Sequence, residues 1–130
     1  MQVEKFWNEF LLNSPEGINY GVHFHDTRGL GLANVLISLK YPIKWIESSF
    51  GGFGGCPFTP GAAGNIATED LISMLESMEI KIDNINKEIL IKAVDMLYSY
   101  EPRDLNSHMY KVLSLVKANR NNILYCKSRL

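Results

Sequence analysis

The chain has 130 residues, of which 46% are hydrophobic and 21% are charged, and its formal net charge is -1. This composition is typical of one globular domain and excludes a disordered chain, a collagen and a coiled coil. The balanced charge argues against attraction to nucleic acid, and no apolar run approaches the roughly 18 residues of a membrane helix. The amino terminus also lacks the pattern of a secretory signal. We therefore expect a soluble protein that is not secreted, with no nucleic-acid or membrane partner.

The first two predicted elements are a helix over residues 3–13 and a strand over residues 18–25. Phe6, Phe10 and Leu11 recur at helical spacing, and a Ser-Pro-Glu-Gly turn follows them. The next segment is short and rich in residues that favour β-structure, which indicates a strand.

Two histidines, His23 and His25, lie at the carboxyl end of this strand. Alternate residues of a strand point to the same face, so the two imidazoles can converge on one cation. The pair also precedes a polar Asp-Thr turn, which is where parallel α/β folds build their sites. The alternative interpretation is two ordinary, half-exposed histidines.

A second helix is predicted from the Asp26-Thr27 cap to about Tyr41, before Pro42, and a second strand is predicted over residues 43–49. This alternation of helices and strands is typical of a parallel α/β sheet. Two parallel strands alone would leave unpaired edges and would need helices on both faces. The pattern therefore predicts a piece of a larger α/β fold.

A long irregular segment over residues 50–65 contains six glycines and two prolines, with Cys56 in its middle. Glycine allows close approach to a ligand, and a loop of this length is usually functional. We therefore expect a loop that closes over a ligand, the alternative being a flexible connector with an incidental thiol. Cys126 is interpreted as incidental, and two cysteines are too few for an extracellular disulfide framework.

Three further helices are predicted because apolar residues recur at the i, i+3, i+4, i+7 spacing. The residues are Leu71/Met74/Leu75/Met78, Leu90/Ala93/Val94/Leu97 and Met109/Val112/Leu113/Val116. From Arg103 onward six basic residues accompany one acidic residue, which gives this end a charge of +5. We interpret it as a solvated helix face, and the alternative is a surface for an acidic partner or a phosphorylated ligand.

Several motifs in the middle of the chain occur together. They are His23-Phe24-His25-Asp26-Thr27-Arg28-Gly29 with Leu32-Ala33-Asn34, Gly54-Gly55-Cys56-Pro57-Phe58, Gly61-Ala62-Ala63-Gly64-Asn65 and Ala67-Thr68-Glu69-Asp70. Over residues 18–80 they closely resemble the hydroxymethylglutaryl-CoA lyase family. The related isopropylmalate, citramalate and homocitrate synthases fit less well, because their strand continues with Asn after the His pair and their loop lacks the Gly-Gly-Cys-Pro segment.

The resemblance implies an α/β fold that is the carboxyl-terminal portion of a (β/α)8 TIM barrel, with two parallel strands, flanking helices and carboxyl-terminal helices. We expect one partial barrel domain over residues 1–130, with the family-like core at about 18–80 and carboxyl-terminal helices over 81–130. The family's early Arg-Asp pair has no match here. The resemblance therefore implies a partner that supplies the amino-terminal half of the barrel, or self-association.

The resemblance also implies a site and a reaction. His23, His25 and Asn65 would bind a divalent cation, Mg or Mn, while Cys56 would be catalytic on a substrate-binding loop formed by Gly51, Gly52, Gly54 and Gly55. The reaction is cleavage of an acyl-CoA substrate, 3-hydroxy-3-methylglutaryl-CoA, to acetoacetate and acetyl-CoA, a step of leucine degradation and ketone body formation.

Two alternatives to this function remain open. One is a lyase for a related 3-hydroxy acyl-CoA, and the other is an inactive remnant or interaction module that retains the family signature. We expect a cytoplasmic location. The chain ends in Ser128-Arg129-Leu130, which resembles a peroxisomal address and gives the alternative location in a eukaryote.

Overall fold

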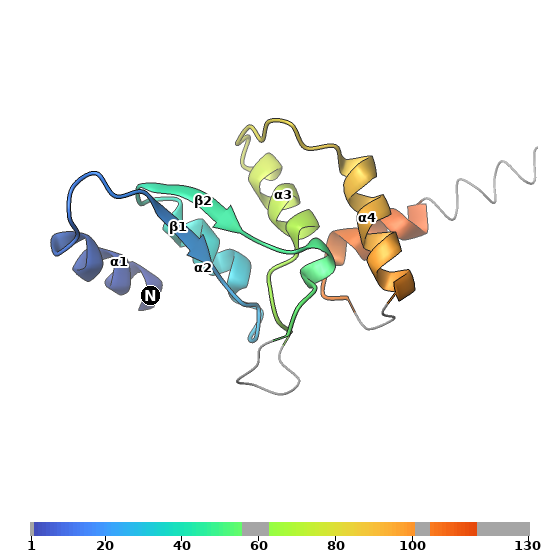
Figure 1. Ribbon diagram of the computed structural model, residues 1–130, viewed down its shortest axis with the longest axis horizontal. Helices are drawn as coiled ribbons and strands as arrows, with labels where there is room; N and C mark the ends of the chain where they lie inside the picture. The colour runs from blue at the N-terminus through green and yellow to red at the C-terminus, as the bar shows by residue number, and fades with distance from the viewer. Residues whose placement is uncertain (1, 56–62, 101–104, 117–130) are drawn as a thin grey trace, which may run out of the picture.

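The computed structural model describes residues 2–55, 63–100 and 105–116, whose arrangement is shown in Figure 1. The elements are α1 (Gln2–Leu12), β1 (Tyr20–His23), α2 (Gly31–Ser38), β2 (Ile43–Glu47), the 3-10 turn η1 (Phe50–Gly52), α3 (Thr68–Ser77) and α4 (Lys87–Tyr100). A further helical segment covers residues 108–116. Each predicted helix and strand is thus confirmed, although both strands and the second helix are shorter than predicted.

The two strands form a parallel pair connected through α2. Tyr20 lies beside Ile43 at one end of the pair, and His23 lies beside Glu47 at the other. Both strands therefore end at the same edge, as expected for a parallel α/β unit. Figure 1 shows α1, α2 and the strands at one end of the molecule, with α3 and α4 at the other.

A buried apolar cluster joins these two ends. Val35 of α2 packs with Ile66 and with Leu71 and Leu75 of α3. The amino-terminal helix is attached separately, because the buried Trp7 donates a hydrogen bond from Nε1 to Oγ of Ser38 over 3.0 Å. The segment around Ile66, which follows the glycine-rich loop, is therefore fixed by the core.

The second helix begins at Gly31, later than the predicted start. The N-cap residue is Leu30, not the predicted Asp26-Thr27 pair, but Oδ1 of Asp26 accepts the Gly31 N–H over 2.7 Å and so pairs the first N–H of the helix. A Cβ at Gly31 would come within 2.2 Å of the Ile66 side chain. This crowding explains why glycine stands where the chain turns into α2.

The carboxyl-terminal helices pack against one another through apolar and polar contacts. Val94 of α4 is fully buried, and the Tyr110 hydroxyl donates to Oδ1 of Asp95 over 2.8 Å. Burial and this hydrogen bond raise the pKa of Tyr110 to about 12. Residues 108–116 are thus held on α4 by a bond that persists across the neutral pH range.

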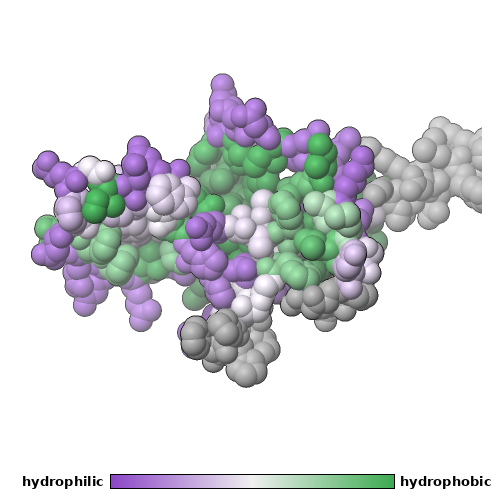
Figure 2. Space-filling model, viewed as in Figure 1, coloured by the Kyte–Doolittle hydropathy of each residue, from purple (hydrophilic) through white to green (hydrophobic). Residues whose placement is uncertain are grey.

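The described residues leave apolar surface uncovered. They form a two-stranded sheet, so both strands keep an open edge, and Phe6, Phe10 and Leu12 of α1 are exposed. Apolar residues also reach the surface over α3 and α4 in the view of Figure 2. Within the described ranges no helix is long and apolar enough to cross a membrane.

Candidate metal centre

The histidine pair and the end of the glycine-rich loop meet beyond the edge of the sheet. His25 and Asn65 form an antiparallel bridge. The Asp26 N–H donates to the Gly64 carbonyl over 2.7 Å, which supports this bridge from the next residue. The rings of His23 and His25 lie 5.1 Å apart between centroids. The structure therefore brings the three predicted ligands together.

In the carboxamide of Asn65 the nitrogen is hydrogen-bonded, whereas the oxygen has no hydrogen-bond partner among the described residues. Its Nδ2 donates to the Phe53 carbonyl over 2.9 Å, which fixes the orientation of the amide. Its Oδ1 is buried and has no hydrogen-bond partner within the described part of the chain. Leaving such an oxygen unsatisfied costs about 1–3 kcal/mol, a cost that a bound cation would offset. The residues present therefore fit a divalent cation held by imidazole nitrogen and amide oxygen.

His23 has a carboxylate neighbour that sequence reasoning missed. Its Nδ1 lies 3.1 Å from Oε2 of Glu47, the last residue of β2. With Nδ1–H as the donor, the Nε2 lone pair of His23 remains available to a metal, as is usual for metal-binding histidines. The signal in the sequence was a carboxylate at the end of the second predicted strand.

The donor set of this site limits how a cation could be bound. Among the described residues, no three His, Cys, Asp or Glu side chains lie close enough to hold a metal ion. A cation at this site would therefore need the amide oxygen of Asn65 as a ligand. Its remaining coordination positions would be filled by ligands other than His23, His25 and Asn65.

The two ends of the glycine-rich loop cross at Gly54 and Gly64. A Cβ at Gly64 would lie 1.9 Å from the Gly54 carbonyl oxygen, and Gly64 has a φ of 78°. Gly51 and Gly52, both predicted to line the substrate loop, are buried, whereas Gly55 is exposed. Cys56 and Cys126 lie outside the described residues.

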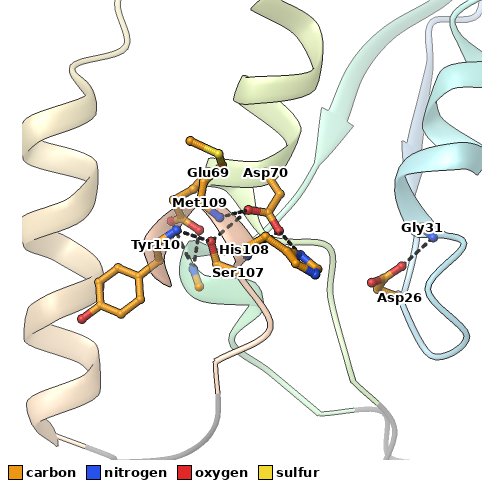
Figure 3. A network of polar contacts seen from close by, with 9 residues as sticks. Asp26, Gly31, Glu69, Asp70, Ser107, His108, Met109 and Tyr110 are labelled. Carbon is orange, nitrogen blue, oxygen red and sulfur yellow. Dashed lines mark hydrogen bonds and ion pairs between the residues drawn. The ribbon is translucent and has the colours of Figure 1, made fainter. Parts of the chain in front are cut away.

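A buried polar network holds the start of the loop, and Figure 3 shows most of it. The Gly51 N–H donates to both carboxylate oxygens of Glu69, over 3.1 and 3.0 Å. Burial raises the pKa of Glu69 above its ordinary value, although the bonds to backbone N–H groups and to Ser107 act in the opposite direction. Glu69 therefore links the first turn of α3 to the loop.

The neighbouring carboxylate, Asp70, caps the helical segment 108–116. Its oxygens accept hydrogen bonds from Ser107 Oγ over 3.1 Å and from the backbone N–H groups of His108 and Met109 over 2.9 and 2.7 Å. Sequence reasoning found Glu69 and Asp70 only as part of a motif. The signal that it missed was an acidic pair in the first turn of a helix.

Comparisons with known proteins show what this chain is similar to. The HMGL-like family model matches residues 2–97. A hydroxymethylglutaryl-CoA lyase of Bacillus subtilis is 40% identical over 111 residues, which cover 85% of this chain and 36% of the relative. The human mitochondrial hydroxymethylglutaryl-CoA lyase is 47% identical over 72 residues, covering 55% of this chain and 22% of the relative.

Solved structures give the same result. The crystal structure of a Bacillus subtilis HMG-CoA lyase aligns with a TM-score of 0.77 at 40% identity and covers 87% of this chain and 37% of that protein. An Acinetobacter baumannii HMG-CoA lyase, solved in complex with coenzyme A and 3-methylmalate, aligns with a TM-score of 0.69 at 41% identity. That alignment covers 85% of this chain and 35% of the solved protein. The chain thus spans about a third of the length of these relatives.

Proposed function

The chain belongs to the HMGL-like family, and we propose that it supplies part of a metal-dependent lyase site that cleaves 3-hydroxy-3-methylglutaryl-CoA within a complete (β/α)8 barrel. The products would be acetoacetate and acetyl-CoA. The observation that supports the proposal is the backbone bridge between His25 and Asn65, together with the buried Asn65 Oδ1, which has no hydrogen-bond partner among the described residues. The relative solved with coenzyme A and 3-methylmalate supports an acyl-CoA substrate.

His23, His25 and Asn65 would hold a divalent cation, Mg or Mn. Such a cation supplies Lewis acidity toward substrate oxygens. The protein's own part is to fix the ligands: Glu47 orients the His23 ring, and the Phe53 carbonyl orients the Asn65 amide. These three ligands are all neutral, so we expect a carboxylate from the rest of the barrel to complete the site.

Cys56 is the proposed acid of the reaction. Its thiol would give a proton to the carbon of the acetyl-CoA enolate that leaves when the carbon-carbon bond breaks. The support is its position on the glycine-rich loop, between Gly51 and Asn65, whose described ends lie at the candidate metal centre. Gly54 and Gly55 would allow the backbone to approach the substrate.

The uncovered apolar surface supports a proposal about what binds to it. The outer edge of β1 lies beside α1, and Gln2, Phe6, Trp7 and Phe10 line with β1 a cavity of about 420 Å³. Since the relatives are almost three times longer than the matched part, we propose that the remaining strands of the barrel cover this face. Those strands would come from the same polypeptide or from another chain, and self-association is the alternative.

A cytoplasmic location is proposed in keeping with a Danio rerio relative that is named as cytoplasmic. Other relatives are named as mitochondrial. The Ser128-Arg129-Leu130 end, on which the peroxisomal alternative depends, lies outside the described residues.

The decisive experiment is an activity assay with the chain alone and with the chain completed by the amino-terminal half of a family relative. We expect acetyl-CoA to form from 3-hydroxy-3-methylglutaryl-CoA only in the completed assembly and only with Mg²⁺ or Mn²⁺ added. His25→Ala should abolish turnover. A folded, completed assembly that binds Mn²⁺ but cleaves neither this substrate nor other 3-hydroxy acyl-CoA thioesters would overturn the lyase proposal and favour a non-catalytic module.

A further inference from the structure

Residues 105–107 lie against both ends of the glycine-rich loop. The backbone N–H of Asn106 donates to the Gly51 carbonyl over 3.2 Å. The side-chain Nδ2 of the same residue donates to the Ala63 carbonyl. One residue from the carboxyl-terminal segment therefore joins the chain before Cys56 to the chain after it.

The start of the loop is held from two sides. Glu69 accepts the Gly51 N–H, and Asn106 donates to the Gly51 carbonyl, so both backbone polar groups of Gly51 are hydrogen-bonded. The buried Leu105 packs beside the same glycine, with Cδ2 only 3.2 Å from where a Cβ would stand. Gly51 is consequently fixed between α3 and the segment that carries Asn106.

That segment is itself anchored to α3. Asp70 accepts hydrogen bonds from the fully buried Ser107 and from the first N–H groups of residues 108–116. Ser107 Oγ in turn accepts the Tyr110 N–H over 3.0 Å. Asn106 thus directly precedes Ser107, which the polar network of Figure 3 attaches to α3.

We propose that Asn106 is a positioning residue for the candidate metal centre, which it serves by tying Ala63 to Gly51. Ala63 is two residues before Asn65, whose Nδ2 is bonded to Phe53 on the opposite end of the loop. Without the Asn106 side chain, residues 63–65 lose the hydrogen bond that joins them to residues 105–107, and the Asn65 amide is less well fixed. This inference rests on the proposed function in one respect: the expected effect on metal binding assumes that Asn65 is a metal ligand.

The test compares Asn106→Ala and Asn106→Asp with a matched control in the full chain. The Asp variant keeps the shape of the side chain but cannot donate to Ala63. The control is Asn86→Ala, which removes an Asn side chain that accepts the N–H groups of Glu88 and Ile89 at the start of α4. Both changes cost a local hydrogen bond, but only those at Asn106 touch the loop.

Two readouts are measured on each variant: hydrogen exchange of the Asp26 amide, which is bonded to the Gly64 carbonyl, and the Mn²⁺ dissociation constant from an EPR titration. Both Asn106 variants should exchange the Asp26 amide at least tenfold faster and weaken Mn²⁺ binding about tenfold, as for residues that support metal ligands. Asn86→Ala should lower the melting temperature and leave both readouts unchanged.

The inference is overturned if the Asn106 variants lower the melting temperature without changing Asp26 exchange, or if Asn106→Asp behaves like the unmodified chain. If the unmodified chain does not bind Mn²⁺ even when it is completed by the amino-terminal half of a family relative, that result counts against the proposed function and not against this inference. In that case the exchange of Asp26 still decides whether Asn106 positions the loop.

Discussion

His23 and Glu47 face each other across the parallel strand pair, with Nδ1 of the histidine 3.1 Å from Oε2 of the glutamate. Both side chains are partly exposed, at 48% and 61% of their surface, so this contact itself contributes little to stability. Its consequence is orientation. A carboxylate that accepts a hydrogen bond from Nδ1–H favours the tautomer protonated on Nδ1 and leaves Nε2 free as a metal ligand.

Replacing Glu47 with Ala should therefore disturb metal binding more than folding. We expect the Mn²⁺ dissociation constant to rise about tenfold or more, while the free energy of unfolding changes by less than about 0.5 kcal/mol. Nitrogen-15 NMR of the His23 ring in the metal-free chain should show the loss of the Nδ1–H tautomer. Glu47→Gln, which keeps an acceptor, should preserve that tautomer.

Glu16→Ala removes an exposed carboxylate remote from the site and serves as the control for Glu47. A wild-type tautomer in Glu47→Ala would show that Glu47 does not orient His23, whatever happens to the affinity for Mn²⁺.

Asp70 should be important for stability, because its carboxylate caps residues 108–116 and accepts the buried Ser107 hydroxyl. Asp70→Ala removes a helix cap and leaves buried donors unpaired, which should cost about 2–4 kcal/mol. Urea unfolding followed by tryptophan fluorescence measures this change. Asp83→Ala, an exposed substitution between α3 and α4, should stay within about 0.5 kcal/mol, and equal effects of the two variants would contradict the cap.

Glu69 should make stability depend on pH. Because burial raises its pKa above the ordinary 4.5 in the folded chain, the folded state holds the proton more tightly than the unfolded state. The contribution of Glu69 to stability is therefore full below pH 4.5 and declines as the pH rises through the raised folded pKa. Glu69→Gln should remove this decline, so its stability relative to the unmodified chain should be higher at pH 7 than at pH 4. A difference between the two proteins that is constant over this range would contradict the shift.

The sequence was sufficient for the parts of the site that depend on local periodicity or motif. His23 and His25 share a strand, whose alternation alone places them together, and Asn65 came from the motif that resembles the family. Glu47 required the register of two parallel strands, and this register shifts between Tyr20 and Gly21. Counting residues along either strand would therefore not have paired Glu47 with His23.

Contacts between distant segments could not be predicted for a different reason. Asn106 meets Ala63 across 43 positions, and Ser107 meets Asp70 across 37. Both contacts depend on how residues 108–116 dock against α3, which the amphipathic pattern of either helix leaves undetermined. Among the basic residues of the carboxyl-terminal end, Lys111 lies within the described ranges and is exposed, whereas the uncharged Leu105 and Ser107 near the start of this end are buried.

The two cysteines can be distinguished in a barrel completed by a family relative's amino-terminal half. Cys56→Ala should lower the turnover number by roughly 100-fold, the scale of losing a positioned acid, with little change in KM. Cys126→Ala should leave the turnover number unchanged. If neither variant changes the turnover number of an active assembly, the loop acts without its thiol. If only Cys126→Ala lowers the turnover number, Cys126 and not Cys56 is the functional thiol.

The crossing of the loop ends can be tested with two glycines that share one backbone conformation. Gly64 and Gly17 both have a φ of 78°, but a Cβ at Gly64 would lie 1.9 Å from the Gly54 carbonyl oxygen, whereas a Cβ at Gly17 would meet nothing within 4 Å. Gly17→Ala therefore measures the strain of a positive φ, about 1–2 kcal/mol. Gly64→Ala should cost at least about 2 kcal/mol more, because the loop ends must also separate. That separation would move Asn65, so Gly64→Ala should weaken Mn²⁺ binding and Gly17→Ala should not. Urea unfolding and Mn²⁺ titration of both variants give the answer, and equal destabilisation would mean that the two ends of the loop do not touch at Gly54 and Gly64.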